Sequence, residues 1–329
     1  MVKADFTAMP NDVLPDWPMF GLDEDVRPAL RRAQANAEAM VLATLVGVDG
    51  GGPRPEGTQM VFAPGLVAGY FSGGCVEGDV AVHAQACLAD GAPRTLVYGE
   101  GSPWPDIRLL CGARIEIVLE RIGRGDAALA EVLAAQADRR CVVYASDGLK
   151  RTCGPDTRLA GAKVTRRYEP VPRLVVVGGD PTALAIAELA AKSGFETTLV
   201  RPRGPERPPP IAGIAYRREP PAEALAAIGL DPWTHVAVAT HDLETDRESL
   251  MAALPSRAAY VGLLGARRRL AGRLAELRSA GMAEADIARL NAPIGLDIGG
   301  KAPFEVAISV VGEITQARYA RANGNTSTH

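Results

Sequence analysis

The segment from Leu174 to Pro202, LVVVGGDPTALAIAELAAKSGFETTLVRP, constrains the fold of this chain more than any other. It consists of an apolar strand-like run, a glycine turn, a helix-like segment with an apolar face and a second apolar run. This order is typical of the opening of a doubly wound parallel sheet. Two further strand-like runs, HVAVAT and AYVGLLG, alternate with helix-like segments at 247–254 and 267–280. The sequence therefore predicts a Rossmann-like C-terminal domain.

A domain boundary is expected near Val171. The stretch RRYEPVPR carries two prolines just before the apolar strand, and prolines interrupt local backbone pairing. The chain has 329 residues, which suits two domains of roughly 100–200 residues each. We expect an N-terminal arm (1–24), a β-rich α+β domain (25–170), a Rossmann-like domain (171–320) and a flexible tail (321–329).

Charge and hydropathy exclude several classes of protein. The formal net charge of −3 gives no general attraction to nucleic acid or to an anionic membrane. The first twenty residues lack the basic start and apolar run of a secretory signal, and no window is long enough to span a bilayer. We therefore expect a cytoplasmic protein without nucleic-acid or membrane partners.

The five cysteines are an odd number and form no paired CxxC spacing, which argues against a disulfide framework or a structural zinc site. They are Cys75, Cys87, Cys111, Cys141 and Cys153.

The N-terminal domain begins with a helix predicted over 25–40, followed by the strand-like run MVLATLVGV. A loop rich in glycine and proline follows at 49–57. Two short β-type runs, TQMVFA and LVAGYFS, flank Pro64-Gly65 as a hairpin. IRLL and RIEIVLERI are further predicted strands.

The stretch SGGCVEGDV places Cys75 after two glycines and just before a predicted helix. The free amides and positive dipole end of a helix N-terminus favour a thiolate, whereas the nearby carboxylates of Glu77 and Asp79 repel one. Two readings stay open: a reactive thiol beside a ligand, or a small buried residue in a turn. Cys87 lies on the apolar face of the same helix and is expected in the core, whereas Cys111 precedes Gly112 in a second glycine corner.

The glycine turn of the C-terminal domain departs from the dinucleotide fingerprint. Asp180 stands where a glycine is needed for close approach of a pyrophosphate, and Asp180-Pro181 is a typical N-cap and first-turn pair. We expect the carboxylate to repel a phosphate there, so NAD(P) binding is not expected. Arg201, at the end of the next strand, suits a 2′-phosphate, so an NAD(P)-dependent oxidoreductase remains the alternative function.

Taken in order, the motifs resemble those of the xanthine dehydrogenase accessory proteins of the XdhC/CoxI type, over about residues 37–320. The motifs that carry the resemblance are GPRPEGTQM, SGGCVEGDV, LLCGARIEI, VVVGGDPTALAIAELAAKSGF, ATHDLETDRESL, YVGLLGARRR and PIGLDIGGKAPFEVAISVVGEI.

The resemblance implies a non-catalytic chaperone that binds molybdenum cofactor, as molybdopterin or a dinucleotide form. It implies that the chaperone holds this cargo while a cysteine desulfurase supplies a terminal sulfur, and then passes it to a xanthine dehydrogenase-like molybdenum hydroxylase. A homodimer is also expected from the family. A soft thiolate suits a sulfur-ligated metal, and glycine corners with amide donors suit the phosphate of the pterin.

Carried over position by position, the resemblance implies cofactor-binding roles for residues in both domains, with Cys75 also a metal ligand. They are Arg54, Gly73, Gly74, Cys75, Glu77, Cys111, Gly112, His241, Asp242, Arg267, Arg268 and Asp297. From the residues alone, His241 and Asp242 equally suit a hydrogen bond that orders a loop. For Arg267 and Arg268, solvated surface is the commoner role in a chain this rich in arginine. The family usually has a GxGHxA-type turn where this chain has GGDPTA, and acids where Arg201 stands.

Overall fold

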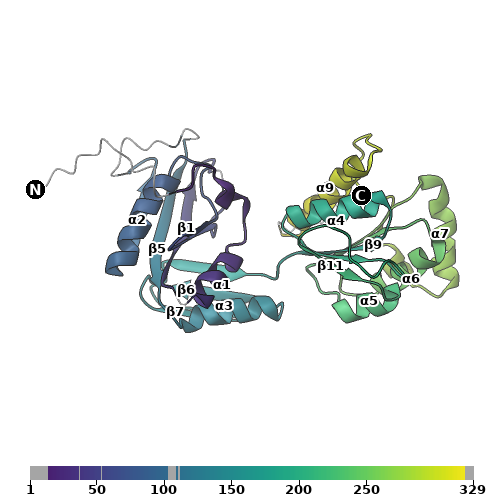
Figure 1. Ribbon diagram of the computed structural model, residues 1–329, viewed down its shortest axis with the longest axis horizontal. Coiled ribbons are helices and arrows are strands. Elements are labelled where there is room, and N and C mark those ends of the chain that lie inside the picture. Colours follow the sequence, from purple (N-terminus) through teal and green to yellow (C-terminus); the bar gives the residue numbers. More distant parts are fainter. Residues whose placement is uncertain (1–13, 37, 53, 103–108, 110–111, 323–329) are drawn as a thin grey trace, which may run out of the picture. The chain divides into compact units, whose positions relative to one another are not determined.

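The computed structural model describes residues 14–36, 38–52, 54–102, 109 and 112–322, without the side chains of the last two. The chain divides into two compact units, Met1–Pro170 and Val171–His329 (Figure 1). The sheets on the two sides of this boundary are separate.

The first unit is built on a five-stranded antiparallel sheet of order β3-β2-β1-β5-β4. The strands are β1 (Met40–Asp49), β2 (Gln59–Ala63), β3 (Leu66–Ala68), β4 (Arg94–Tyr98) and β5 (Arg114–Ile122). The central strand β1 pairs with β5 along its whole length, from Met40 opposite Ile122 to Asp49 opposite Arg114. The predicted hairpin at Pro64-Gly65 is present between β2 and β3.

Helices cover both faces of this sheet. They are α1 (Arg27–Ala35), α2 (Glu77–Asp90) and α3 (Ala127–Ala137), after a short 3-10 turn η1 (Met19–Leu22). Val41, Ala43 and Leu45 of β1 pack with the apolar face of α2, while Met40 and Leu42 pack with α1 and α3. This alternation follows from the period of two in a strand and buries both faces of the sheet.

A smaller antiparallel sheet, order β7-β6-β8, completes the first unit: β6 (Val142–Ser146), β7 (Arg151–Gly154) and β8 (Val164–Tyr168). Glu120 of β5 is fully buried and links the two sheets. It accepts a hydrogen bond from Tyr144 Oη (2.9 Å) and lies 3.4 Å from Arg151 Nε. Burial raises the pKa of this carboxyl, although its hydrogen bonds and Arg151 act in the opposite direction.

The second unit is a parallel six-stranded sheet of order β11-β10-β9-β12-β13-β14. This is the strand order of the classical Rossmann fold, with the switch in direction between β9 and β12. The strands are β9 (Arg173–Gly178), β10 (Glu196–Val200), β11 (Ile214–Arg217), β12 (Thr234–Ala239), β13 (Tyr260–Leu263) and β14 (Leu290–Asn291). The predicted Rossmann-like sheet is confirmed.

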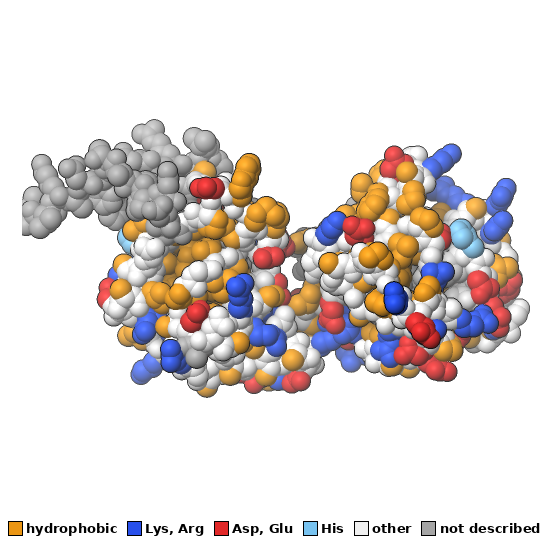
Figure 2. Space-filling view, viewed as in Figure 1, with side chains coloured by type: hydrophobic (Ala, Val, Ile, Leu, Met, Phe, Trp, Pro, Cys, Tyr) orange, Lys and Arg blue, Asp and Glu red, His pale blue; other side chains and the backbone are white. Residues whose placement is uncertain are grey.

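Six helices surround this sheet: α4 (Pro181–Lys192), α5 (Pro221–Ile228), α6 (Leu243–Ala253), α7 (Arg267–Ser279), α8 (Glu284–Ile287) and α9 (Pro303–Ala322). Helices α4 and α9 pack on one face, and α5 to α8 pack on the other (Figure 1). On α9, Val310, Val311 and Ile314 are buried and pack in the core of this face. Hydrophobic side chains also gather on the outside where α9 and α4 lie (Figure 2). Phe304 and Ile308 of α9 are exposed.

Several predicted boundaries differ from the structure; α6, for example, begins at Leu243 rather than at residue 247. The first helix ends at Ala35, because from Met40 the chain is already paired with β5. Strand β3 stops at Ala68, because the next amide, Gly69 N, donates to Phe20 O outside the sheet (2.8 Å). Within the part of the chain that the structure describes, no helix combines the length and apolarity needed to cross a membrane.

Candidate functional site

Three loops of the first unit meet at one edge of its five-stranded sheet. Strand β1 ends where β5 begins, with Asp49 opposite Arg114. Because neighbouring strands are antiparallel, the start of β2 and the ends of β3 and β4 lie at this same edge. The edge therefore brings together Arg54, the SGGC stretch and Gly112, which are far apart in sequence.

The SGGC stretch forms a compact turn, residues 71–76, which we call the thiol loop. Glu77, the first residue of α2, turns its carboxylate back into this loop and is only 2% exposed. Its Oε1 accepts hydrogen bonds from the amides of Phe71 (2.8 Å), Ser72 (2.6 Å) and Gly73 (3.2 Å). Its Oε2 accepts from the amides of Gly74 (2.8 Å) and Val76 (3.3 Å) and from Ser72 Oγ (2.7 Å). The carboxylate is the centre around which the loop folds.

The two glycines make this arrangement possible. Gly73 has φ 83° and Gly74 has φ 118°, values that other residues rarely adopt. Successive amides can then point to one spot, which is how backbone nests bind anions. Burial raises the pKa of Glu77, but the hydrogen bonds from Ser72 and Phe71 outweigh it, so the pKa lies below its ordinary value.

Cys75 is exposed at the outside of the thiol loop. Its own amide donates to Ser72 Oγ (3.0 Å), which fixes the backbone beneath the thiol. Helix α2 begins two residues later, with Val76 as its N-cap, so Cys75 stands just before the helix. Cys87, in contrast, is fully buried, as predicted.

Arg54 lies beside the residue that leads into the thiol loop. Its guanidinium carbon is 4.8 Å from the ring centroid of Tyr70, and its Nη1 is 2.7 Å from a carboxylate oxygen of Glu24. Arg54 Nε is buried and donates no hydrogen bond to any described residue. A planar cation is thus held at the same edge as Cys75.

Gly112 lies two residues before β5 and is exposed. A Cβ built on Gly50 would be 3.6 Å from Gly112 O, so the loop after β1 and the loop before β5 run side by side. Cys111, its predicted companion, falls outside the described residues.

In the second unit, the remaining candidate residues follow the carboxyl ends of the parallel strands, the edge at which open α/β sheets bind ligands. Asp180 is the N-cap of α4 and accepts a hydrogen bond from Ala183 N (2.8 Å), as predicted. Its second oxygen lies 3.0 Å from His241 Nε2. This contact joins the loop after β9 to the loop after β12, across the switch point of the sheet.

Arg201 covers the glycine turn after β9. A Cβ built on Gly179 would lie 2.4 Å from Arg201 Nε, and one built on Gly204 would lie 2.9 Å from Arg201 Cδ. The exposed side chain of Arg201 therefore lies over Gly179, where a dinucleotide fold would take its pyrophosphate.

Asp242 is the N-cap of α6. Its carboxylate accepts hydrogen bonds from Thr245 Oγ1 (2.5 Å) and Glu244 N (3.3 Å), and these two bonds lower its pKa. Asp242 thus orders the start of α6, whereas His241 pairs with Asp180 and not with Asp242. The exposed side chain of Asp242 also stands at the ligand edge.

Beneath this loop lies a buried ion pair that the sequence did not reveal. Asp246 of α6 is 2% exposed, and its Oδ2 is 2.7 Å from Arg273 Nη1 of α7. Asp246 Oδ1 accepts a hydrogen bond from Thr240 Oγ1 (2.7 Å), at the end of β12. No local pattern links residues on two different helices, so only the tertiary structure shows this network.

Arg267 and Arg268 open α7 and are exposed, and no side-chain cap lies at that helix start. Asp297 is exposed in the loop that follows β14. These three residues lie on segments that follow β13 and β14. In the strand order of the sheet, these strands come after β12, which is followed by His241 and Asp242.

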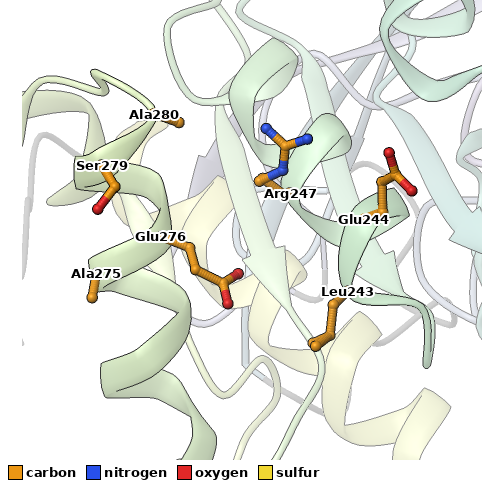
Figure 3. Close-up of a pocket in the computed structure, with 7 residues that line it drawn as sticks. All are labelled: Leu243, Glu244, Arg247, Ala275, Glu276, Ser279 and Ala280. Carbon is orange, nitrogen blue, oxygen red and sulfur yellow. The ribbon is translucent and has the colours of Figure 1, made fainter.

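A groove of about 650 Å³ opens between α6 and α7 (Figure 3). Leu243, Glu244 and Arg247 line it from α6, and Ala275 and Glu276 are among its lining residues from α7. None of the candidate residues lines it, although Leu243 directly follows Asp242. A second groove, of about 510 Å³, lies between the β2–β3 hairpin and α2.

No cluster of three or more histidine, cysteine or acidic side chains suited to a metal ion occurs among the described residues. The sequence also missed Ser72, Tyr70 and Glu24, which hold the thiol loop and Arg54. Only Ser72, inside the SGGC motif, had a signal that could have indicated its role.

Comparison with known proteins gives matches along both units. The model of the XdhC Rossmann domain matches residues 174–314, and that of the XdhC and CoxI family matches residues 33–99. The chain is 32% identical over 306 residues to the molybdenum cofactor insertion chaperone PaoD of Escherichia coli (strain K12), covering 90% of each protein. It is 27% identical over 323 residues to a probable xanthine dehydrogenase subunit of Bacillus subtilis (strain 168), covering 85% of this chain and 94% of the relative.

A crystal structure described as a xanthine dehydrogenase from Bacillus halodurans has the same fold. Its TM-score is 0.74 at 24% identity, over 90% of this chain and 96% of the other. With the sequence matches in both units, these findings show that the chain belongs to the XdhC and CoxI family.

Proposed function

We propose that this protein is a chaperone for molybdenum cofactor in the maturation of a xanthine dehydrogenase-type molybdenum hydroxylase. The observation that carries the proposal is the relative named as a molybdenum cofactor insertion chaperone, which matches nine-tenths of the chain. The relative named as a probable xanthine dehydrogenase subunit supports the same class of recipient. The exposed thiol loop supports a binding role.

In this proposal, the cargo contacts the edge of the first unit where three loops meet. Cys75 supplies a soft sulfur ligand to the metal, which suits a cargo that brings sulfur ligands of its own. Arg54 supplies a planar cation for the phosphate of the pterin. Gly73, Gly74, Gly112 and Cys111 would form the rest of the surface. The proposed cofactor-binding residues of the second unit are His241, Asp242, Arg267, Arg268 and Asp297.

The chaperone would hold the cofactor, as molybdopterin or a dinucleotide form, while a cysteine desulfurase supplies the terminal sulfur. It would then pass the cofactor to the apo-hydroxylase, with a homodimer as the working form. Two observations weigh against the alternative of an NAD(P)-dependent oxidoreductase: Asp180 caps the helix that would hold the phosphate, and Arg201 lies over the glycine turn.

The test is to purify the protein from cells that make molybdenum cofactor and to measure bound molybdenum and pterin by mass spectrometry. We expect molybdenum and pterin in comparable molar amounts. We also expect the purified protein to activate an apo-hydroxylase when the two proteins are mixed. A preparation that carries neither, and does not activate the hydroxylase when cofactor is added, would contradict the proposal.

Two cysteine variants test the proposed role of the thiol. Cys75→Ser is nearly isosteric but a harder ligand, so it should keep the melting temperature and lose cofactor. Cys87→Ser should do the reverse, because a hydroxyl buried in the core costs about 1–3 kcal/mol of unfolding free energy. If Cys75→Ser retains and transfers cofactor like the wild type, the thiol is structural.

A further inference from the structure

Every backbone amide of the thiol loop already has a side-chain acceptor, either Ser72 within the loop or Glu77 directly after it. The amides of residues 71, 72, 73, 74 and 76 donate to the carboxylate of Glu77. The amide of Cys75 donates to Ser72 Oγ, which itself donates to Glu77. In other proteins such converging amides bind a phosphate or another external anion. Here the chain fills that place with its own side chain.

Glu77 therefore has no capacity left for a ligand. Each of its two oxygens accepts three hydrogen bonds, whereas an ionised carboxylate offers about four lone-pair positions in all. The side chain is also buried, so a cofactor outside the loop would not contact it. Its role must be exerted through the residues that it holds.

We propose that Glu77 is the positioning residue of Cys75: as an internal anion it locks the thiol loop, so that the sulfur is presented outward in one arrangement. The inference rests on the proposed function, because it assumes that Cys75 meets the metal of the cargo. It explains the order of the motif. Two glycines turn the amides inward, the glutamate receives them, and Cys75 is left exposed.

The test compares Glu77→Gln with the wild type. Glutamine has nearly the same shape, but it lacks the charge and presents an NH₂ donor to a ring of donors. The matched control is Asp90→Asn, which removes one charge from the last turn of the same helix, where the side chain is 53% exposed and pairs with Arg94. Three properties are measured: hydrogen exchange of amides 71–76, alkylation of Cys75 by iodoacetamide, and bound molybdenum.

For Glu77→Gln we expect exchange of the loop amides to rise about tenfold or more, because charge-assisted hydrogen bonds are lost. We expect alkylation of Cys75 to become faster, because a negative charge behind the sulfur is gone and the freed amides can turn toward it. Bound molybdenum should fall as far as it does in Cys75→Ser. Asp90→Asn should match the wild type in all three measurements.

Two results would overturn the inference. One is loop amides that stay protected in Glu77→Gln. The other is amides that exchange faster while molybdenum is retained at the wild-type amount. If Glu77→Gln does not fold, Ser72→Ala is measured instead, because it removes only the hydroxyl that links Glu77 to the amides of Cys75 and Val76. The inference then requires smaller changes of the same sign: faster amide exchange, faster alkylation of Cys75 and less bound molybdenum. If wild-type protein binds no molybdenum, the proposed function fails, while exchange and alkylation still decide the role of Glu77.

Discussion

At the scale of single residues, Glu77 couples the protonation of one carboxyl to the shape of the thiol loop. Its pKa in the folded protein lies below the ordinary 4.5. A lowered pKa means that the ionised form is stabilised by folding, so this stabilisation is complete above the unfolded value and is lost as the pH falls through the folded one.

We therefore expect the loop to keep its structure at neutral pH and to open only when the pH falls through the folded pKa of Glu77, which lies below 4.5. The measurement is an NMR titration of the Gly73 and Gly74 amides, whose shifts should change together at a midpoint below 4.5. Glu77→Gln should remove this transition. Amide shifts that titrate at the ordinary value or above would contradict a lowered pKa for this carboxyl.

At the scale of elements, the N-termini of the helices at the ligand edge of the Rossmann-like sheet decide what can bind there. Asp180 caps α4 and Arg201 covers Gly179, so we expect millimolar NAD or NADP to leave the melting temperature unchanged. A nucleotide at a hundredfold excess over its Kd would stabilise the protein by about 2.7 kcal/mol, which a thermal shift would detect. A saturable shift with either nucleotide would refute this and favour an oxidoreductase.

The buried pair of Asp246 and Arg273 joins α6 to α7 beneath the same edge. Asp246→Asn should lower the unfolding free energy by roughly 3–5 kcal/mol, because it leaves the guanidinium buried without its counter-charge. Chemical denaturation measures this loss. Replacing both partners, with Asp246→Leu and Arg273→Met, should recover most of it, and a double variant no more stable than the single one would contradict the argument.

Features with a local cause could be predicted from the sequence. The apolar face of α2, the cap at Asp180 and the parallel strands follow from spacing and residue type over a few positions. The role of Glu77 could not, because spacing does not show that its side chain turns back toward the preceding loop. Asp246 and Arg273 lie on separate helices, and the contact of Arg54 with Tyr70, just before the thiol loop, depends on strand register. Which of the candidate residues touch a cofactor remains a prediction.

At the scale of the whole molecule, the two units have separate sheets and separate hydrophobic cores. Each is of a size that can fold alone. We expect residues 171–329 expressed alone to fold, with one cooperative thermal transition and a far-UV circular dichroism spectrum typical of an α/β protein. An aggregated or unfolded fragment would show that the second unit depends on the first.

The carboxylate within the thiol loop also bears on repeated use of the molecule. A loop that is held open by a bound phosphate collapses when the phosphate leaves, and it must be rebuilt for the next round. In this chain the counter-ion is covalently attached, so it cannot diffuse away or be washed out by salt. If the protein carries a cofactor as proposed, the thiol loop would have the same structure before the cofactor binds and after it leaves, so each round of binding and release would start from the same conformation.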